Sequence, residues 1–202
     1  NQSSTKLTRL TPDNDPYNLV NEVINVEPTP AYSATAQGSS PLDDVMPWAG
    51  MRMRNIIDGV LGAWEDEEGF SLSTADVMVY CPEMYFFIMY VVAEKKWYFY
   101  VADGFAEGMQ RHPFSEKYLA RYLTDSAYES KCSGVANAQY LNIHRDNAVA
   151  KGTGWHQQGL DGRSYVNLVY IVEYADWNTQ QIIGNGDTTF QSSNGGTDAM
   201  VY

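Results

Sequence analysis

The segment that most constrains the fold is the longest apolar block of the chain, "YVNLVYIVEYADWNTQ", at residues 165–180. It is not a membrane span, because Asn167, Glu173 and Asp176 interrupt it and the chain has no run of about 18 apolar residues. The block is therefore expected to lie in a folded core, as a helix or as a strand.

The periodicity of this block fits both kinds of element. As a strand, it places Val166, Leu168, Tyr170, Val172 and Tyr174 on one face. As a helix, it places Tyr165, Leu168, Val169, Val172 and Ala175 on one face, and Val166, Tyr170, Tyr174 and Trp177 on a second. The β-branched content favours a strand, whereas the length and the capping residue Ser164 favour a helix. We predict a helix over about 164–177, nearly all buried because two of its faces are apolar.

Residues 77–103 carry the strongest strand signal, since they are rich in Val, Ile, Tyr and Phe. They predict a hairpin of "YFFIMYVV" and "WYFYVAD" joined by a turn at "AEKKW". Strands this apolar on both faces are usually covered on both sides. Pro82 limits the pairing of the preceding strand and predicts an edge or a bulge. A second, shorter helix is predicted over about 143–151, closed by Gly152.

The first 44 residues differ from the rest of the chain. Residues 1–30 hold four prolines and one short apolar cluster around Val20, and a small-residue linker follows them. We predict an extended N-terminal arm and linker over 1–44 that serves attachment or oligomerisation, with a disordered leader as the alternative. A single domain is expected over 45–202.

The composition narrows the classes of function. The 202 residues carry 25 acidic and 13 basic side chains, a net charge of −12, so we expect no nucleic-acid binding and no adhesion to anionic bilayers. The start has no pattern of a secretory signal. Fifteen tyrosines and five tryptophans are typical of recognition proteins, although most of these rings should fill the core. Cys81 and Cys132 do not make a disulfide scaffold, and a single bridge between them stays open.

No constellation typical of a catalytic site stands out. The candidates are a zinc trio (His144, Asp146, His156), a Cys132–His nucleophilic pair, a calcium-like spacing (Asp13, Asp15) and two carboxylates of the apolar block (Glu173, Asp176). The zinc spacing is irregular, Pro16 breaks the calcium pattern, and carboxylates in such blocks more often cap or pair locally. We therefore expect no catalytic, cofactor-binding or metal-binding residues and no cofactor, and the ligand-binding residues remain unassigned.

Five segments over residues 77–186 occur in a recognisable order: "DVMVYCPEMYFFIMY", "KWYFYVADGFAEGMQRHPF", "KYLARYLTDSAYESKCSGV", "NAVAKGTGWHQQ" and "LVYIVEYADWNTQQIIGNG". In this order they resemble the C-type lectin-like domain of phage and prophage virion proteins of gut bacteria, relatives of the variable proteins targeted by diversity-generating retroelements. The resemblance implies an α+β fold in which small twisted antiparallel sheets pack on two helices. It also implies a strand over 117–123.

The resemblance further implies a non-enzymatic protein of the virion surface, made in the bacterial host cytoplasm. It would be a fibre, tail tip or head decoration that binds a host surface glycan or protein. Residues 1–30 are expected to contact other virion proteins, and a homo-oligomer is expected, with a trimer favoured because weak contacts gain from multivalency.

Two other functions remain open. The chain could be an inert decoration or assembly protein of the capsid or tail. It could also be a formylglycine-generating-type oxidase, which shares the broad fold. In the lectin-like family the ligand-facing residues lie in a C-terminal segment, and this chain ends at Tyr202 before such a segment, so no family binding residue carries over. We expect residues 165–177 to form core and to contact no ligand.

Overall fold

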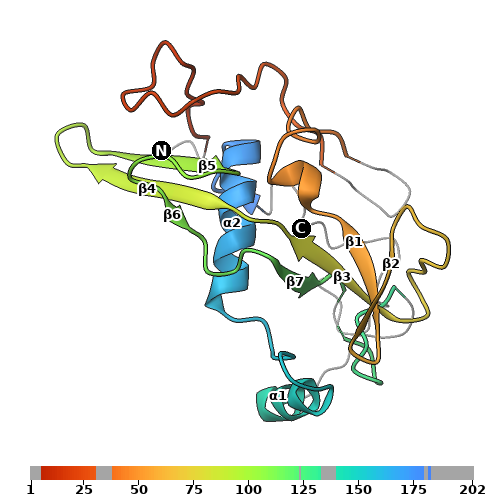
Figure 1. Ribbon diagram of the computed structural model, residues 1–202. Coiled ribbons are helices and arrows are strands. Elements are labelled where there is room, and N and C mark those ends of the chain that lie inside the picture. Colours follow the sequence, from red (N-terminus) through yellow and green to blue (C-terminus); the bar gives the residue numbers. More distant parts are fainter. Residues whose placement is uncertain (1–5, 31–37, 123, 133–139, 180–181, 183–202) are drawn as a thin grey trace.

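A computed structural model describes residues 6–30, 38–122, 124–132, 140–179 and 182. Within these residues the chain forms two α-helices and two small antiparallel sheets (Figure 1). The predicted α+β class is therefore confirmed. The tail 183–202 lies outside the described residues.

The larger sheet has four strands in the order β2–β1–β3–β7. They are β1 (Met53–Ile57), β2 (Val60–Trp64), β3 (Asp76–Cys81) and β7 (Lys117–Ala120), and a short 3-10 helix, η1 (Trp48–Gly50), precedes them. The strand expected over 117–123 is thus present in its first four residues. The smaller sheet has the order β5–β4–β6, from β4 (Tyr85–Val91), β5 (Lys96–Ala102) and β6 (Gln110–Arg111).

Pro82 ends a central strand and does not mark an edge or a bulge, so that prediction is wrong. β3 lies between β1 and β7, and its last pair joins Cys81 to Lys117. The proline follows that pair directly. A residue without an N–H group is tolerated there because the ladder needs no further donor.

The predicted hairpin is confirmed as β4 and β5, with Tyr90 opposite Trp97 near its end. Its two faces are covered by different parts of the chain. One face packs against the N-terminal arm, through Leu10, Tyr17, Leu19 and Val20. The other face packs, near its base, against the core under the long helix. Figure 1 shows the hairpin projecting beyond that helix. The prediction that both faces of the hairpin are covered is therefore confirmed near its base. It is wrong toward the turn, where Tyr90, Val92 and Trp97 are exposed.

The apolar block forms the helix α2 (Leu160–Tyr174), but both of its predicted ends are wrong. Ser164 lies inside the helix, and Gly159 holds the N-cap position without a side-chain cap. At the other end Ala175 adopts a left-handed conformation, φ 47°, which stops the helix before Trp177. The helix is also less buried than expected, because Asn167 is exposed and several neighbours are half-buried.

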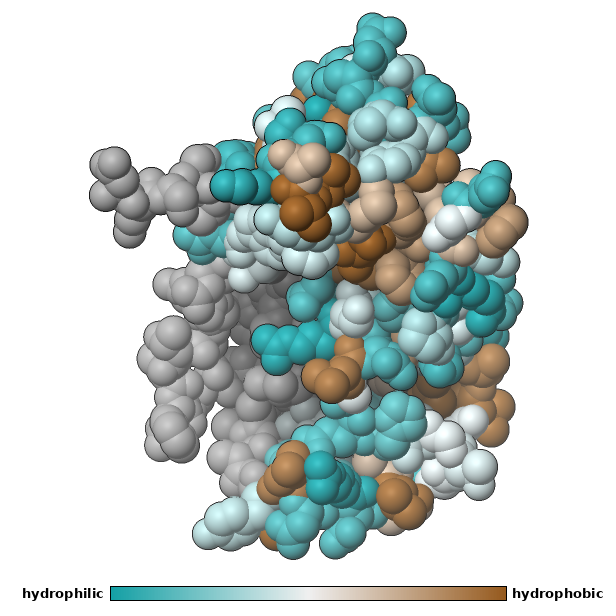
Figure 2. Space-filling view, turned by 90° about the vertical axis from the view of Figure 1, so that its left-hand side faces the viewer, coloured by the Kyte–Doolittle hydropathy of each residue, from teal (hydrophilic) through white to brown (hydrophobic). Residues whose placement is uncertain are grey.

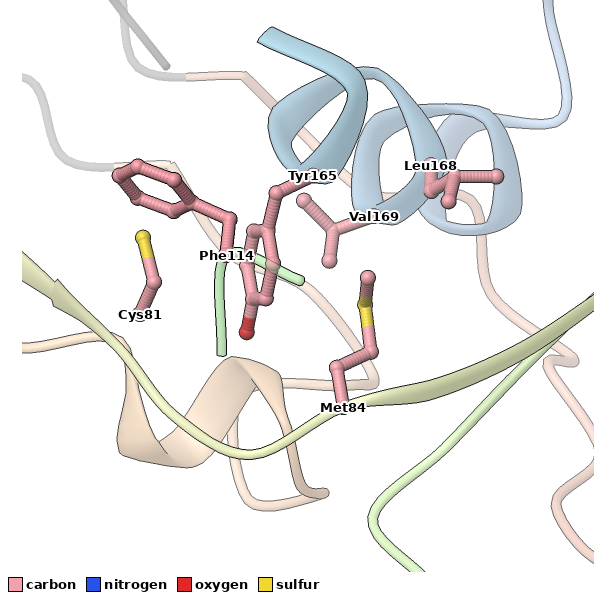
Figure 3. Packing of buried hydrophobic residues seen from close by; sticks show 6 residues of the cluster. All are labelled: Cys81, Met84, Phe114, Tyr165, Leu168 and Val169. Atoms are coloured by element: carbon pink, nitrogen blue, oxygen red, sulfur yellow. The ribbon is translucent and has the colours of Figure 1, made fainter. Parts of the chain in front are cut away.

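The core lies beneath one face of α2. Figure 3 shows Tyr165 and Val169 pointing from the helix toward Met84, and Leu168 and Cys81 belong to the same core cluster. The Tyr165 hydroxyl donates to the carbonyl oxygen of Pro82 at 3.0 Å, which satisfies the only polar atom of that side chain.

A glycine lets α2 approach the larger sheet closely. A Cβ atom at Gly162 would lie 2.8 Å from the Leu119 side chain and 3.2 Å from that of Phe114. Any other residue at this position would therefore require the Leu119 side chain or the helix itself to shift.

The shorter helix is confirmed as α1 (Leu141–Ala150), against a prediction of about 143–151. The positive φ of Gly152, 126°, agrees with its predicted closing role. None of its residues is buried. Within the part of the chain that the structure describes, no helix is long and apolar enough to cross a membrane.

The N-terminal arm lies on its own chain, along the hairpin and the end of α2. The Arg9 guanidinium donates to the carbonyl oxygens of Val172 and Glu173 in the last turn of α2, where a cation also meets the negative end of the helix dipole. Leu7 N–H donates to the carbonyl oxygen of Ala175. The division of the chain at residue 44 stays a prediction.

Asp15 fastens the arm to the hairpin. Its buried carboxylate accepts hydrogen bonds from the backbone N–H groups of Tyr17, Leu19 and Val20 and from the Tyr100 hydroxyl. Burial acts to raise the pKa of Asp15, but these hydrogen bonds outweigh it and hold the pKa below its usual value.

Asp15→Asn is expected to destabilise the protein by about 2 kcal/mol, because charge-assisted hydrogen bonds weaken and a buried amide gains no acceptor. Urea denaturation at neutral pH measures this, with exposed Asp13→Asn as the control. Since the pKa is lowered, the wild-type advantage should disappear as the pH falls below about 3.8. Equal stability of Asp15→Asn and Asp13→Asn at neutral pH would refute this role.

Candidate binding site

The histidines predicted as zinc candidates do not come together. His144 and Asp146 lie on α1, and exposed His156 interacts with the carbonyl oxygen of Gln157. No group of three or more His, Cys, Asp or Glu side chains in the described residues is placed to hold a metal ion. His112 is buried beside Phe86, and burial lowers its pKa.

The two cysteines are free thiols, so the bridge left open by the sequence does not form. Cys81 is fully buried in the core, and burial raises its pKa to about 12. Its thiol therefore stays protonated at neutral pH and is a poor nucleophile. Cys132 is half-buried, and its backbone N–H donates to the carbonyl oxygen of Leu72.

The remaining acidic candidates have local structural partners. The Asp15 carboxylate is already hydrogen-bonded to backbone N–H groups of the arm, whereas Asp13 is exposed in a turn. The two residues of the calcium-like pair therefore do not come together. Asp176 is buried, and its carboxylate accepts a hydrogen bond from the Asn178 N–H at 2.8 Å. Glu173 is different, because it lines a cavity.

The end of the hairpin carries an exposed apolar surface, which we call the hairpin patch. It comprises Ile88, Tyr90, Val92, Trp97 and Trp177. Val92 is 75% exposed and Trp97 is 58% exposed. Exposed apolar side chains gathered in this way mark interaction sites more often than isolated ones do.

The register of the hairpin explains how this patch forms. Tyr90 lies opposite Trp97, and their rings are 5.0 Å apart. Trp97 stacks on Phe99, whose ring meets that of Trp177 at 5.2 Å. The aromatic rings thus form a row along one face of the hairpin, from Phe99, which packs on the core, to Tyr90 near the turn. Because each ring packs against a neighbour, the surface is formed before any partner binds.

Figure 2 views the molecule from the side toward which the hairpin points in Figure 1. Hydrophobic side chains gather above the middle of this face and are surrounded by hydrophilic ones. An apolar centre with a polar rim is the usual arrangement of a protein interface.

A second candidate is a cavity of about 260 Å³ between α2, η1 and the larger sheet, which we call the helix cavity. Five of its lining residues come from α2: Val166, Val169, Tyr170, Glu173 and Tyr174. The expectation that 165–177 contributes only to the core is therefore too narrow, because part of the helix faces this space.

The Glu173 carboxyl lies at the wall of the helix cavity. Burial raises its pKa, and nearby Asp43 adds to this effect. Hydrogen bonding to the Ser40 side chain, the charge of Arg9 and an interaction with Trp48 act in the opposite direction without reversing it. The carboxyl therefore keeps its proton to a higher pH than an exposed glutamate does.

Glu173→Gln is expected to stabilise the protein at neutral pH. The folded state holds the Glu173 proton above the ordinary pKa of 4.5, so wild-type stability should fall as the pH rises through this region. The glutamine variant lacks this fall. Urea denaturation from pH 4 to 8 measures the difference, with exposed Glu107→Gln as the control. Parallel pH profiles for Glu173→Gln and the wild type would show that Glu173 titrates normally.

Comparison of the chain with protein-family models, with curated proteins and with solved structures finds no match. The described residues therefore offer two features that bear on function, the hairpin patch and the helix cavity.

Neither site was predicted from the sequence, for different reasons. The patch has a signal, since Tyr90 and Trp97 lie on one face of a predicted hairpin, but the sequence does not say where α2 stops covering that face. The cavity has no local signal, because Trp48, Arg121 and Tyr170 meet only in the folded chain.

Proposed function

We propose that the chain is a bacteriophage virion protein whose C-type lectin-like domain attaches the particle to its host cell. In this proposal the hairpin patch contacts a protein on the host surface. The order of sequence motifs supports the virion assignment, and the α+β arrangement of two helices and two small antiparallel sheets is compatible with it.

The observation that carries the binding function is the hairpin patch. Trp and Tyr are the residues that most often dominate binding energies at interfaces, and Tyr90 and Trp97 lie exposed beside each other. Because packed neighbours already order their rings, little conformational entropy remains to be lost on binding.

The chemistry of the patch favours a protein over a glycan. The aliphatic side chains Ile88 and Val92 share the surface with the aromatic rings. Such a mixture suits the apolar centre of a protein interface. The net charge of −12 favours a neutral or basic partner surface and disfavours anionic polymers of the cell envelope.

The arm and the oligomer complete the proposal. Residues 6–30 pack with one side on the hairpin of their own chain, so contacts with other virion proteins would use the opposite side. A trimer would present three patches together and raise the avidity. Light scattering of the purified chain is expected to give the mass of a trimer, and a monomer mass would contradict this part.

Binding of the labelled full chain to host cells tests the function. Cells treated with protease are expected to lose binding, whereas cells whose glycans are oxidised by periodate should keep it. Binding that survives protease and is lost with periodate would replace the protein receptor by a glycan. No binding to any host cell, for a chain that does assemble into particles, would favour the inert decoration and overturn the adhesion proposal.

A further inference from the structure

Three buried polar atoms around the helix cavity lack a hydrogen-bond partner within the described part of the chain. They are Trp48 Nε1, Arg121 Nε and the Tyr170 hydroxyl, and all three residues line the cavity. Tyr170 is only 7% exposed. A buried donor without a partner costs about 1–3 kcal/mol, so three around one space point to an acceptor that fills it.

Arg121 gives this group of donors a positive charge. It follows β7 directly, and its guanidinium lies beside the Tyr122 ring, 5.9 Å from the centroid. It forms no ion pair with any described residue. A half-buried guanidinium with a free Nε–H is suited to a carboxylate, which accepts from several donors at once.

Acidic side chains occupy other parts of the same cavity wall. Glu173 is half-buried, and exposed Asp43 and Glu65 lie where the cavity reaches the surface. Glu65 already interacts with Arg52, whereas Glu173 has no ion pair shorter than 4.0 Å among the described residues. The cavity thus presents to one ligand three donors without a hydrogen-bond partner and, in Glu173, a carboxyl group that forms no ion pair with any described residue.

These charges exclude the simpler ligand classes. A plain anion would face Asp43 and Glu173, and a plain cation would face Arg121 and leave the three donors unsatisfied. A purely apolar molecule would satisfy none of the polar groups. A molecule with a carboxylate at one end and an ammonium group beside it satisfies both sets.

We propose that the helix cavity binds a free α-amino acid with an aliphatic side chain. Its carboxylate accepts from Trp48, Arg121 and Tyr170, and its ammonium group donates to Glu173. Its side chain packs against the apolar part of the wall, formed by Met51, Met53 and Val79. The volume of about 260 Å³ suits a molecule smaller than the drug-sized ligands of cavities of roughly 300–1,000 Å³.

This site is separate from the hairpin patch and does not depend on the adhesion proposal. The two share no residue. A failure of host-cell binding therefore leaves the cavity proposal unchanged, and a failure of amino-acid binding leaves the adhesion proposal unchanged.

The test is a nuclear magnetic resonance titration of the ¹⁵N-labelled full chain, observed at the tryptophan indole N–H groups. The chain has five tryptophans, and Trp48→Phe identifies the Trp48 signal by its loss. The probe is L-leucine at up to about 10 mM, well above the millimolar Kd of a weak ligand. L-leucinamide lacks the carboxylate, 4-methylpentanoate lacks the ammonium group, and glucose is a neutral polyol control.

L-leucine is expected to shift the Trp48 indole signal in a saturable way, and both truncated probes should bind at least tenfold more weakly. Arg121→Gln should weaken leucine binding at least tenfold, and the conservative Tyr170→Phe should weaken it several-fold. Arg145→Gln, an exposed change on α1, should leave it unchanged. The proposal is overturned if leucine produces no shift in the wild type, if leucinamide binds as tightly as leucine, or if glucose binds and leucine does not.

Discussion

Leu168→Asp is expected to unfold the protein at room temperature. Leu168 is 3% exposed and packs in the core beside Tyr165 and Val169 (Figure 3). Removing a buried leucine side chain costs about 2–5 kcal/mol. The new carboxylate has no partner in this apolar cluster and adds several kcal/mol more. The sum is comparable to the net stability of about 5–15 kcal/mol that a domain possesses. Circular dichroism and the dispersion of amide resonances measure the loss.

Two neighbouring changes separate the loss of the core from a general effect of charge on the helix. Asn167→Asp adds the same carboxylate on the exposed side of α2 and is expected to cost less than about 0.5 kcal/mol. Leu168→Met keeps the apolar volume and should cost less than about 1.5 kcal/mol. A folded Leu168→Asp variant with native stability would show that α2 is not the core of the fold.

The elements of the fold were predictable where their signal is local. The hairpin follows from two dense runs of β-branched and aromatic residues, and the turn between them, at residues 92–95, lies within two residues of the bounds predicted at "AEKKW". The helical interpretation of residues 165–180 depended on length and on Ser164 as a cap, since the apolar pattern fitted a strand equally well; the helix is confirmed, but Ser164 is not its cap. In the structure this helix buries one face against both sheets.

The boundaries were not predictable, because other parts of the chain set them. Ser164 has the chemistry of an N-cap, yet α2 begins at Leu160, and the close contact of Gly162 with β7 places that turn inside the helix. The helix stops at Tyr174, where Arg9 of the distant arm binds the last carbonyl groups. Pro82 was misplaced for a related reason: a proline beside a strand does not reveal whether it lies within the strand or just beyond it.

The two candidate sites depend on contacts between distant residues. Trp48 and Arg121 reach α2 only because η1 and β7 flank it, so no spacing in the sequence marks the helix cavity. The catalytic and metal-binding candidates in the sequence were selected by residue type alone, and several of them have structural roles in the fold. Asp15 anchors the arm, and Cys81 fills the core.

Trp97→Ser is expected to weaken binding to the host cell at least 30-fold. A tryptophan at the centre of an interface contributes about 2 kcal/mol or more when it is truncated. Trp97 contacts both Tyr90 and Phe99, so its loss interrupts the aromatic row of the hairpin patch. It is 58% exposed, and the variant should keep its fold.

Phe105→Ser is the matched control, because Phe105 is an aromatic residue that is 71% exposed outside the hairpin patch. The decisive measurement is the half-saturating concentration of labelled protein on host cells, for the wild type and both variants at equal thermal stability. A function carried by the hairpin patch predicts an increase of at least 30-fold for Trp97→Ser and none for Phe105→Ser. Equal binding by Trp97→Ser and the wild type would contradict it.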